Sequence, residues 1–171
     1  FDRFSRQPSF AALAAAVGLA RPLLLQSMYL FKQPHIGAEV DWHQDASFLV
    51  TEPPSVVGFW LAIDDASLAN GCLLALPGAH RGPLRQRFAR HGMTMTMQRL
   101  DATPWPDTAA MPLEVPRGSL VVLHGLLPHG SAANRSSQPR HAYSLHLVDG
   151  AAAYAEDNWL QRPNLPLRGF A

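Results

Sequence analysis

The sequence contains a single cysteine, Cys72, and no block of lysine and arginine residues. One cysteine excludes an internal disulfide and is typical of a reducing compartment, so we expect a cytoplasmic protein. The arginines of the segment 81–90 are spread out, and 14 basic against 13 acidic residues leave a formal net charge of +1. This balance does not favour nucleic acid as a partner.

Long apolar runs are also missing from the sequence. No stretch reaches the roughly 18 apolar residues that a membrane span requires, so no membrane partner is expected. The alanine-rich segment 11–20 has the composition of a signal segment, but the acidic Asp2 precedes it and no clear cleavage site follows. We interpret this segment as part of a helix.

The composition is otherwise globular, with 47% hydrophobic and 16% charged residues in a chain of 171. This length suits a single domain over 1–171 with a real core, and it is too short for two domains. The chain begins with Phe1 and not with Met, so we expect a fragment or a processed form that lacks an upstream N-terminal segment. The sequence contains no indication of the oligomeric state.

Short apolar runs closed by Pro, Gly, Asn or Asp make up most of the chain. Ser9 as a possible N-cap and Gly18 near the end predict one helix over 8–19. The later runs predict strands at 23–33, 47–52, 55–64, 71–77, 113–125 and 140–148. One helix followed by many short strands predicts a mainly β fold, a sandwich or jelly roll. The irregular region 84–112, which contains several Met and Pro residues, predicts a long surface excursion or lid.

The segment DWHQD (41–45) places a histidine and an aspartate one residue apart. In a strand, residues i and i+2 project to the same side, so His43 and Asp45 project together while Gln44 faces away. An imidazole, a carboxylate and a second histidine from elsewhere form a face that leaves coordination positions open on Fe(II). The spacing alone occurs often by chance, and it also fits a surface pair or a hydrogen-bonded pair.

The segment 121–148 offers the third ligand. Two apolar runs flank the turn-favouring residues AANRSSQP, which predicts an antiparallel hairpin. In that hairpin His129 lies opposite Arg140, and Ser131 joins the same face. An arginine grips a carboxylate through two hydrogen bonds, so a metal beside Arg140 suggests a small acid that chelates the metal and is anchored at its other end.

His124 is the alternative to His129, because both histidines precede a glycine, but the cross-strand register favours His129. The last predicted strand alternates, and His146 falls on the side of the site, where it can hydrogen-bond a ligand. The small and polar side consists of Arg140, Ala142, Ser144 and His146, and the opposite side of His141, Tyr143, Leu145 and Leu147. The first side suits an interior that holds a ligand, and the second can pack beneath a covering layer.

The stretches that carry these residues resemble a known family. The segments QSMYLFKQPHIGAEVDWHQD, NGCLLALPGAHRG and LHGLLPHGSAANRSSQPRHAYSLHLVD are similar to the phytanoyl-CoA dioxygenase family of Fe(II)- and 2-oxoglutarate-dependent oxygenases. The tail EDNWLQRP (156–163) is similar to the phytanoyl-CoA dioxygenase domain-containing branch of that family. The resemblance runs from residue 23 to residue 163.

The resemblance implies a double-stranded β-helix, the cupin-like jelly roll, with an N-terminal helix. It implies His43, Asp45 and His129 as catalytic iron ligands, with Fe(II), 2-oxoglutarate and O2 as cofactors and cosubstrates. The implied reaction hydroxylates a small organic substrate and releases succinate and CO2. The alternatives are a non-catalytic jelly roll that binds 2-oxoglutarate or a metal, and a cupin with another metal.

The resemblance also implies the residues that bind the cosubstrate. Arg140 and Ser131 would hold the distal carboxylate of 2-oxoglutarate, and Met28 and Trp60 would line its pocket. Relatives carry a further segment upstream with a lysine that contacts the cosubstrate, and the matched residues contain no counterpart of it. Lys32 is expected near the mouth of the barrel, together with Gln33, where both can touch a substrate.

Overall fold

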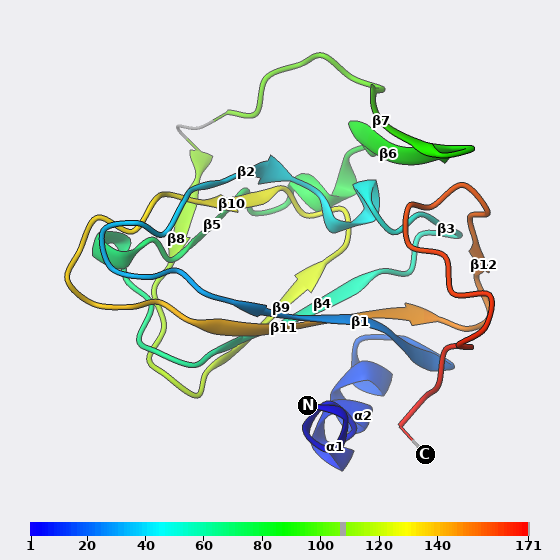
Figure 1. Ribbon diagram of the computed structural model, residues 1–171, viewed down its shortest axis with the longest axis horizontal. Coiled ribbons are helices and arrows are strands. Elements are labelled where there is room, and N and C mark those ends of the chain that lie inside the picture. Colours follow the sequence, from blue (N-terminus) through cyan, green and yellow to red (C-terminus); the bar gives the residue numbers. More distant parts are fainter. Residues whose placement is uncertain (107–108, 171) are drawn as a thin grey trace.

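The computed structural model describes residues 1–106 and 109–170, and its strands form two four-stranded sheets that face each other (Figure 1). One sheet has the longer strands and is called the larger sheet below. Its strand order is β1 (Pro22–Leu30), β11 (Ala142–Asp149), β4 (Val57–Ala62) and β9 (Leu120–His124). The smaller sheet has the order β2 (Val40–His43), β10 (His129–Ser131), β5 (Leu73–Ala75) and β8 (Met111–Leu113). Neighbouring strands within both sheets are antiparallel. The architecture is a double-stranded β-helix, which confirms the predicted mainly β jelly roll.

Shorter elements surround the two sheets. The strands β3 (Thr51–Glu52) and β12 (Ala153–Tyr154) pair with each other, as do β6 (Gln86–His91) and β7 (Thr94–Arg99). Three turns of 3-10 helix lie at η1 (Asp45–Ser47), η2 (Leu68–Asn70) and η3 (Ala79–Arg81). The predicted strand 47–52 is therefore wrong except for β3, because η1 turns the chain away before it.

The β6–β7 hairpin corrects the prediction that the region 84–112 is irregular. Its second strand, TMTMQR, is exposed at every residue and alternates Thr with Met, a period of two that suits a strand. Gly92, at the turn between the strands, has a φ of 62°, a left-handed conformation that glycine adopts without steric cost. Part of the region is therefore a regular hairpin on the surface, beside the smaller sheet (Figure 1).

The predicted N-terminal helix is present as α2 (Pro8–Ala16), preceded by the short α1 (Asp2–Ser5). Its N-cap is Gln7 and not Ser9, because Pro8 takes the first helical position, where its missing N–H is not needed. Gly18 follows the helix with a φ of 94°, as expected for a glycine just past a helix end. None of the helices in the described ranges is long and apolar enough to cross a membrane.

Helix α2 covers the outer face of the larger sheet (Figure 1). Phe10 and Ala14 of this helix are buried against Phe59 of β4 and against the outward side chains of β11. Those β11 side chains are Tyr143, Leu145 and Leu147. The alternation predicted for the last strand is therefore confirmed, because its apolar side packs beneath a helix while Ser144 and His146 turn into the space between the sheets.

The predicted hairpin over 121–148 is wrong. Strand β10 pairs with β2 and β5 in the smaller sheet, whereas β11 pairs with β1 and β4 in the larger one. The connection crosses between the sheets around the buried Asn134, whose amide donates hydrogen bonds to the carbonyls of Lys32 (3.1 Å) and Gln138 (2.7 Å). Its side-chain oxygen accepts hydrogen bonds from the backbone and hydroxyl of Ser136. The turn-favouring residues thus build a side-chain-bonded crossover and not a tight β-turn.

Candidate metal centre

Two histidines meet because β2 and β10 are neighbours: His43 is the register partner of His129. Strand β2 ends at His43, so the expectation that Asp45 lies in the same strand is wrong. The intervening Gln44 nevertheless keeps an extended backbone, with φ −114° and ψ 132°, before η1 begins. The i, i+2 relation therefore holds, and Asp45 projects to the same side as His43.

Gln44 faces away from these side chains, as predicted, and anchors the segment. It is 1% exposed and donates hydrogen bonds to the carbonyls of Leu126 (2.9 Å) and Pro83 (3.2 Å). Its side-chain oxygen accepts a hydrogen bond from the backbone N–H of Arg85 (2.9 Å). Because all of these partners lie outside β2, Gln44 ties the strand end to the loops around it.

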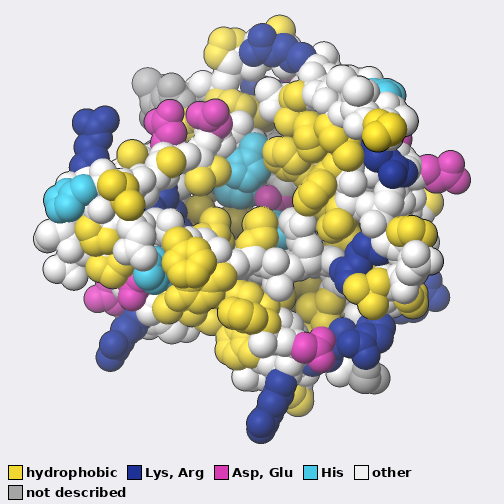
Figure 2. Space-filling view, in the orientation of Figure 1, with side chains coloured by type: hydrophobic (Ala, Val, Ile, Leu, Met, Phe, Trp, Pro, Cys, Tyr) yellow, Lys and Arg dark blue, Asp and Glu magenta, His cyan; other side chains and the backbone are white. Residues whose placement is uncertain are grey.

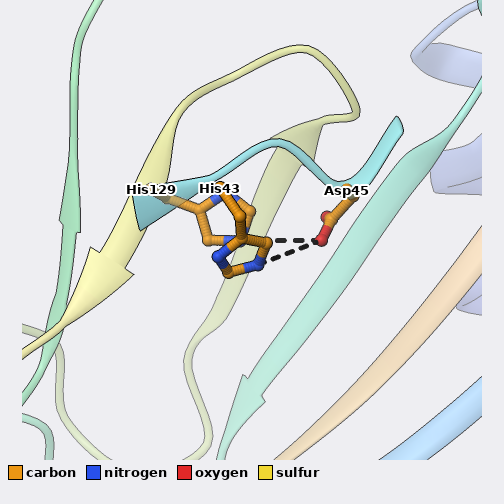
Figure 3. Close-up of side chains that lie close together, drawn as sticks. All are labelled: His43, Asp45 and His129. Atoms are coloured by element: carbon orange, nitrogen blue, oxygen red, sulfur yellow. Dashed lines mark ion pairs between the residues drawn. The ribbon is translucent and has the colours of Figure 1, made fainter. Parts of the chain in front are cut away.

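The side chains of His43, Asp45 and His129 converge, with one ligand atom from each within 4.8 Å of the others (Figure 3). The Oδ1 atom of Asp45 lies 3.6 Å from Nε2 of His43 and 3.7 Å from Nε2 of His129. Each histidine places Nδ1 against a backbone carbonyl, of Asp41 (2.8 Å) and Leu127 (2.9 Å) respectively. A carbonyl only accepts, so Nδ1 donates and the neutral ring presents the Nε2 lone pair to the shared point. This donor set fits a divalent transition metal.

The charges of the cluster suit a cation. Burial raises the pKa of Asp45, but the neighbouring His146, His43 and His129 outweigh it and hold that pKa well below its usual range. Burial lowers the pKa of His129, so this imidazole favours its neutral form. For His43, burial lowers the pKa, but the nearby carboxylate of Asp45 and the hydrogen bond to the carbonyl of Asp41 raise it overall.

His146 and Gly58 complete the surroundings of Asp45. The Nε2 atom of His146 lies 3.3 Å from Oδ2 of Asp45, and its Nδ1 lies 3.2 Å from the amide nitrogen of Gln26. A Cβ at Gly58 would lie 3.0 Å from Oδ2, so a larger residue there would crowd the carboxylate. The strand alternation placed His146 on this side, whereas no sequence signal identified Gly58.

A cavity of about 240 Å³, which we call the inner chamber, lies between the sheets beside the three converging side chains. All seven predicted site residues line it, namely His43, Asp45, His129, Met28, Trp60, Ser131 and Arg140. Trp60 is 4% exposed, whereas Met28 is 41% exposed and reaches the second cavity described below. The structure therefore brings the complete predicted set together.

Arg140 is 1% exposed and is oriented by two hydrogen bonds. Its Nε donates to the carbonyl of Gly71 (3.0 Å) and its Nη2 to Oγ of Ser131 (3.3 Å). Burial lowers the pKa of Arg140 to about 10, which keeps the guanidinium charged at neutral pH. Its Nη1 has no hydrogen-bond partner in the part of the chain that the structure describes. A buried charged donor without a partner fits an anionic ligand, and a carboxylate is the group that an arginine fork matches.

A second cavity of about 510 Å³, the outer chamber, adjoins the inner one. The two chambers share His43, Asp45, His146, Met28 and Val40 as lining residues. The apolar walls of the outer chamber come from Trp42, Phe48, Leu49, Met97 and Trp159. Figure 2 shows a hollow with histidine side chains inside and hydrophobic side chains around it. Trp42, which had no role in the sequence analysis, and Trp159, from the tail motif, are therefore wall residues.

His124 and Lys32 lie outside the linings of both chambers. His124 lines neither chamber; its Nδ1 accepts a hydrogen bond from the N–H of Leu126 (3.0 Å) and its ring lies 5.2 Å from that of His80. Lys32 is 5% exposed and contacts Ser131, so its expected place at the mouth of the barrel is wrong. Gln33, by contrast, is exposed.

Facing antiparallel sheets with two histidines and an aspartate between them have the architecture of the double-stranded β-helix class of non-haem iron oxygenases. The structure is similar to that of EvdO2 from Micromonospora carbonacea var. aurantiaca complexed with 2-oxoglutarate, with TM-score 0.66 and 25% identity over 94% of this chain and 69% of that chain. It also shares its fold with the epimerase SnoN in complex with Fe3+, alpha ketoglutarate and nogalamycin RO, with TM-score 0.74 and 22% identity over 96% of this chain and 65% of that chain.

The sequence comparison is more specific. The profile of the family "Phytanoyl-CoA dioxygenase (PhyH)" matches residues 1–142, and the chain belongs to this family. It is 44% identical over 167 residues to a phytanoyl-CoA dioxygenase from Arabidopsis thaliana, covering 97% of this chain and 59% of the relative. It is 47% identical over 161 residues to phytanoyl-CoA dioxygenase domain-containing protein 1 from Bos taurus, covering 91% of this chain and 55% of the relative. The chain thus spans less than two thirds of the length of these relatives.

Proposed function

We propose that the protein is an Fe(II)- and 2-oxoglutarate-dependent dioxygenase in which His43, Asp45 and His129 bind the iron. The observation that carries the proposal is the convergence of these ligand atoms within 4.8 Å beside a buried arginine with an unpartnered Nη1. Two imidazoles and one carboxylate would leave positions on a bound metal open for an organic acid and for O2. Membership of the phytanoyl-CoA dioxygenase family supports the same assignment.

The inner chamber is the proposed site of 2-oxoglutarate. Arg140 donates from Nη1 to the distal carboxylate, and Ser131, whose Oγ already accepts from Nη2 of the same arginine, contacts that carboxylate as well. Trp60 and Met28 form apolar walls along the cosubstrate. The metal-binding side chains line the same cavity, so an acid of this size can reach both the metal site and Arg140.

When held by His43, Asp45 and His129, Fe(II) would supply the chemistry that couples oxidative decarboxylation of 2-oxoglutarate to hydroxylation of a substrate C–H bond, with one oxygen atom of O2 passing to succinate and the other to the substrate. The residues of this chain supply geometry and a dry pocket. Asp45 stays ionised; its Oδ2 lies 3.3 Å from Nε2 of His146, and its Oδ1 faces the two histidines. The apolar walls of the outer chamber exclude water and orient the substrate.

The proposed substrate is a small organic molecule that binds in the outer chamber. Its apolar walls favour a substrate with an apolar body, and the chamber of about 510 Å³ has the size of a small-molecule site. The names of the relatives refer to phytanoyl-CoA, and the identity of the substrate of this chain is a separate question. A cytoplasmic location remains a prediction based on the single cysteine.

Succinate formation tests the proposal. In air, the protein should convert 2-oxoglutarate to succinate only when Fe(II) is added, and His129→Ala should abolish this conversion. Isothermal titration of 2-oxoglutarate into the Mn(II)-loaded protein should show binding to the wild type. Binding without any succinate would identify a non-catalytic module and contradict the proposal, as would succinate formation that continues after complete removal of metal.

A further inference from the structure

Lys32 is the only lysine of the chain, and it is buried beside the inner chamber. Lysine is rarely buried without a partner, because its ammonium is strongly hydrated. Its Nζ donates hydrogen bonds to Oγ of Ser131 (2.7 Å) and to the carbonyl of Ala132 (2.5 Å). The chain therefore places its one lysine directly behind a residue that lines the proposed cosubstrate site.

The backbone is shaped to admit this side chain. Gly71 has a φ of 79°, and a Cβ there would lie 3.1 Å from Cδ and 3.3 Å from Nζ of Lys32. The same glycine presents its carbonyl to Nε of Arg140. One glycine thus makes room for the lysine stem and orients the arginine.

The two cations lack a negative partner. Neither Lys32 nor Arg140 forms an ion pair with a carboxylate anywhere in residues 1–106 and 109–170. Burial, and then the charge of Arg140, lowers the pKa of Lys32 to about 8. Two buried like charges that converge on one hydroxyl repel each other, and an anion bound nearby would relieve that repulsion.

Ser131 is constrained by both cations. Its Oγ lies within hydrogen-bond distance of Nζ of Lys32 and Nη2 of Arg140, and both of these groups can only donate. The two lone pairs of Oγ are therefore occupied, and the hydroxyl hydrogen is left to donate to an acceptor elsewhere. Because Ser131 lines the inner chamber, a carboxylate in that chamber is the available acceptor.

We propose that Lys32 is a positioning residue for the anionic cosubstrate: it locks the Ser131 hydroxyl as a donor into the inner chamber and adds a second positive charge behind Arg140. This inference rests on the proposed function, and it assigns to Lys32 a share in the binding of the distal carboxylate. The metal-binding side chains do not take part in this contact between Lys32 and Ser131, so Lys32 affects binding of the acid and not binding of the metal.

The first experiment is isothermal titration of 2-oxoglutarate into the Mn(II)-loaded wild type, Lys32→Met and Arg135→Met. Methionine keeps much of the stem volume and removes the charge, and Arg135, exposed on the loop after Ser131, is the control for the loss of one charge. Loss of a charge-assisted hydrogen bond should weaken binding about tenfold in Lys32→Met. Arg135→Met should bind like the wild type, and both variants should keep the wild-type affinity for Mn(II).

The KM for 2-oxoglutarate should rise by a similar factor in Lys32→Met while kcat at saturating 2-oxoglutarate changes little. Equal binding by the wild type and Lys32→Met would overturn this inference and leave the proposed function intact. No binding by the wild type would overturn both. A general folding defect would instead reduce the Mn(II) affinity and kcat together.

A second measurement needs no variant. In protein labelled with lysine carrying ¹³C at Cε, the single lysine contributes one NMR signal, whose pH titration reports the pKa of Lys32 directly. The ionisable groups whose charges act on Lys32 are Arg140, Cys72 and Glu39. Arg140 stays charged and burial raises the pKa of Cys72, so the titration around pH 8 reports the protonation of Lys32 itself.

The sign of the pH effect follows from linkage. The protonated lysine is the form that favours an anion, so bound 2-oxoglutarate should raise the pKa above about 8, and affinity should fall as the pH rises through that value. At pH 8 the wild type should take up about half a proton per 2-oxoglutarate bound, and Lys32→Met none. A lysine signal whose titration does not move when 2-oxoglutarate binds would overturn the inference, even if Lys32→Met fails to fold.

Discussion

The inner and outer chambers meet at the candidate metal centre but are built from different parts of the fold. The inner chamber is walled by strands of both sheets, and three of its polar residues, Arg140, Ser131 and His129, are at most 5% exposed. The outer chamber takes walls from the β6–β7 hairpin and from the C-terminal tail, where Met97 is 45% and Trp159 is 37% exposed.

This difference separates two tasks. Groups held by sheet ladders keep a fixed geometry, which suits a common metal and a common cosubstrate. Loops and hairpins vary without disturbing the sheets, which suits the selection of a particular substrate. Substitutions in the two chambers should therefore affect different steps of the proposed reaction.

The largest effect is expected where the chambers meet. Asp45→Ala removes the only charged donor of the cluster, so metal affinity should fall by more than about 100-fold and turnover should be lost. Metal content and 2-oxoglutarate decarboxylation measure both effects. Asp41→Ala, two residues from His43 on the same strand, removes an equal charge and should keep the metal content. An Asp45→Ala protein that decarboxylates 2-oxoglutarate at the normal rate would refute the ligand assignment.

The next effect belongs to the inner chamber alone. Arg140→Lys keeps a positive charge but loses the fork and the bond from Nε to Gly71, so the KM for 2-oxoglutarate should rise roughly tenfold. The iron content should not change, because Arg140 contacts none of the metal-binding side chains. Steady-state kinetics with varied 2-oxoglutarate, together with metal analysis, test this prediction. An unchanged KM would count against the role of Arg140.

A smaller effect is expected in the outer chamber. Trp159→Ala enlarges a partly exposed wall, so the KM for a substrate that stimulates turnover should change by a few-fold. The KM for 2-oxoglutarate, measured without that substrate, should stay as in the wild type. Leu100→Ala, exposed just after β7 and outside both chamber linings, is the matched apolar control. A Trp159→Ala variant that loses 2-oxoglutarate binding would show that the two chambers are not separable.

The smallest effect is expected at the rival histidine. His124→Ala should leave metal content and 2-oxoglutarate turnover unchanged, because His124 lies outside both chambers, whereas His129→Ala should lose both. Metal analysis of the two variants side by side measures the contrast. Loss of metal in His124→Ala with retention in His129→Ala would reverse the assignment.

Features that depend on residues close together in the sequence were predicted best. The i, i+2 relation of His43 and Asp45 held even though the strand ends between them, because Gln44 alone had to be extended. The choice of His129 over His124 agrees with the lining of the inner chamber, but the hairpin used to justify it does not exist. His129 instead meets His43 across neighbouring strands, and it reaches Arg140 only because the two sheets face each other.

Residues that a local pattern could not place were those whose partners lie far along the chain. Lys32 contacts Ser131 across 99 positions, and His146 approaches Asp45 from the opposite sheet. A lysine beside Gln33 and Pro34 looks like a loop residue in the sequence, and only the crossover around Asn134 makes it a buried one.

By itself, the sequence determined which chemical groups the protein has and which face of each strand they occupy, because side-chain direction along a strand repeats every two residues. The tertiary structure alone decided which strands are neighbours and which loops enclose the outer chamber. It also decided that a cavity lies between the sheets, with Arg140 in its wall and Lys32 behind Ser131. Those properties depend on contacts between residues distant in sequence, whose register is set by the packing of the whole core and not by any local pattern.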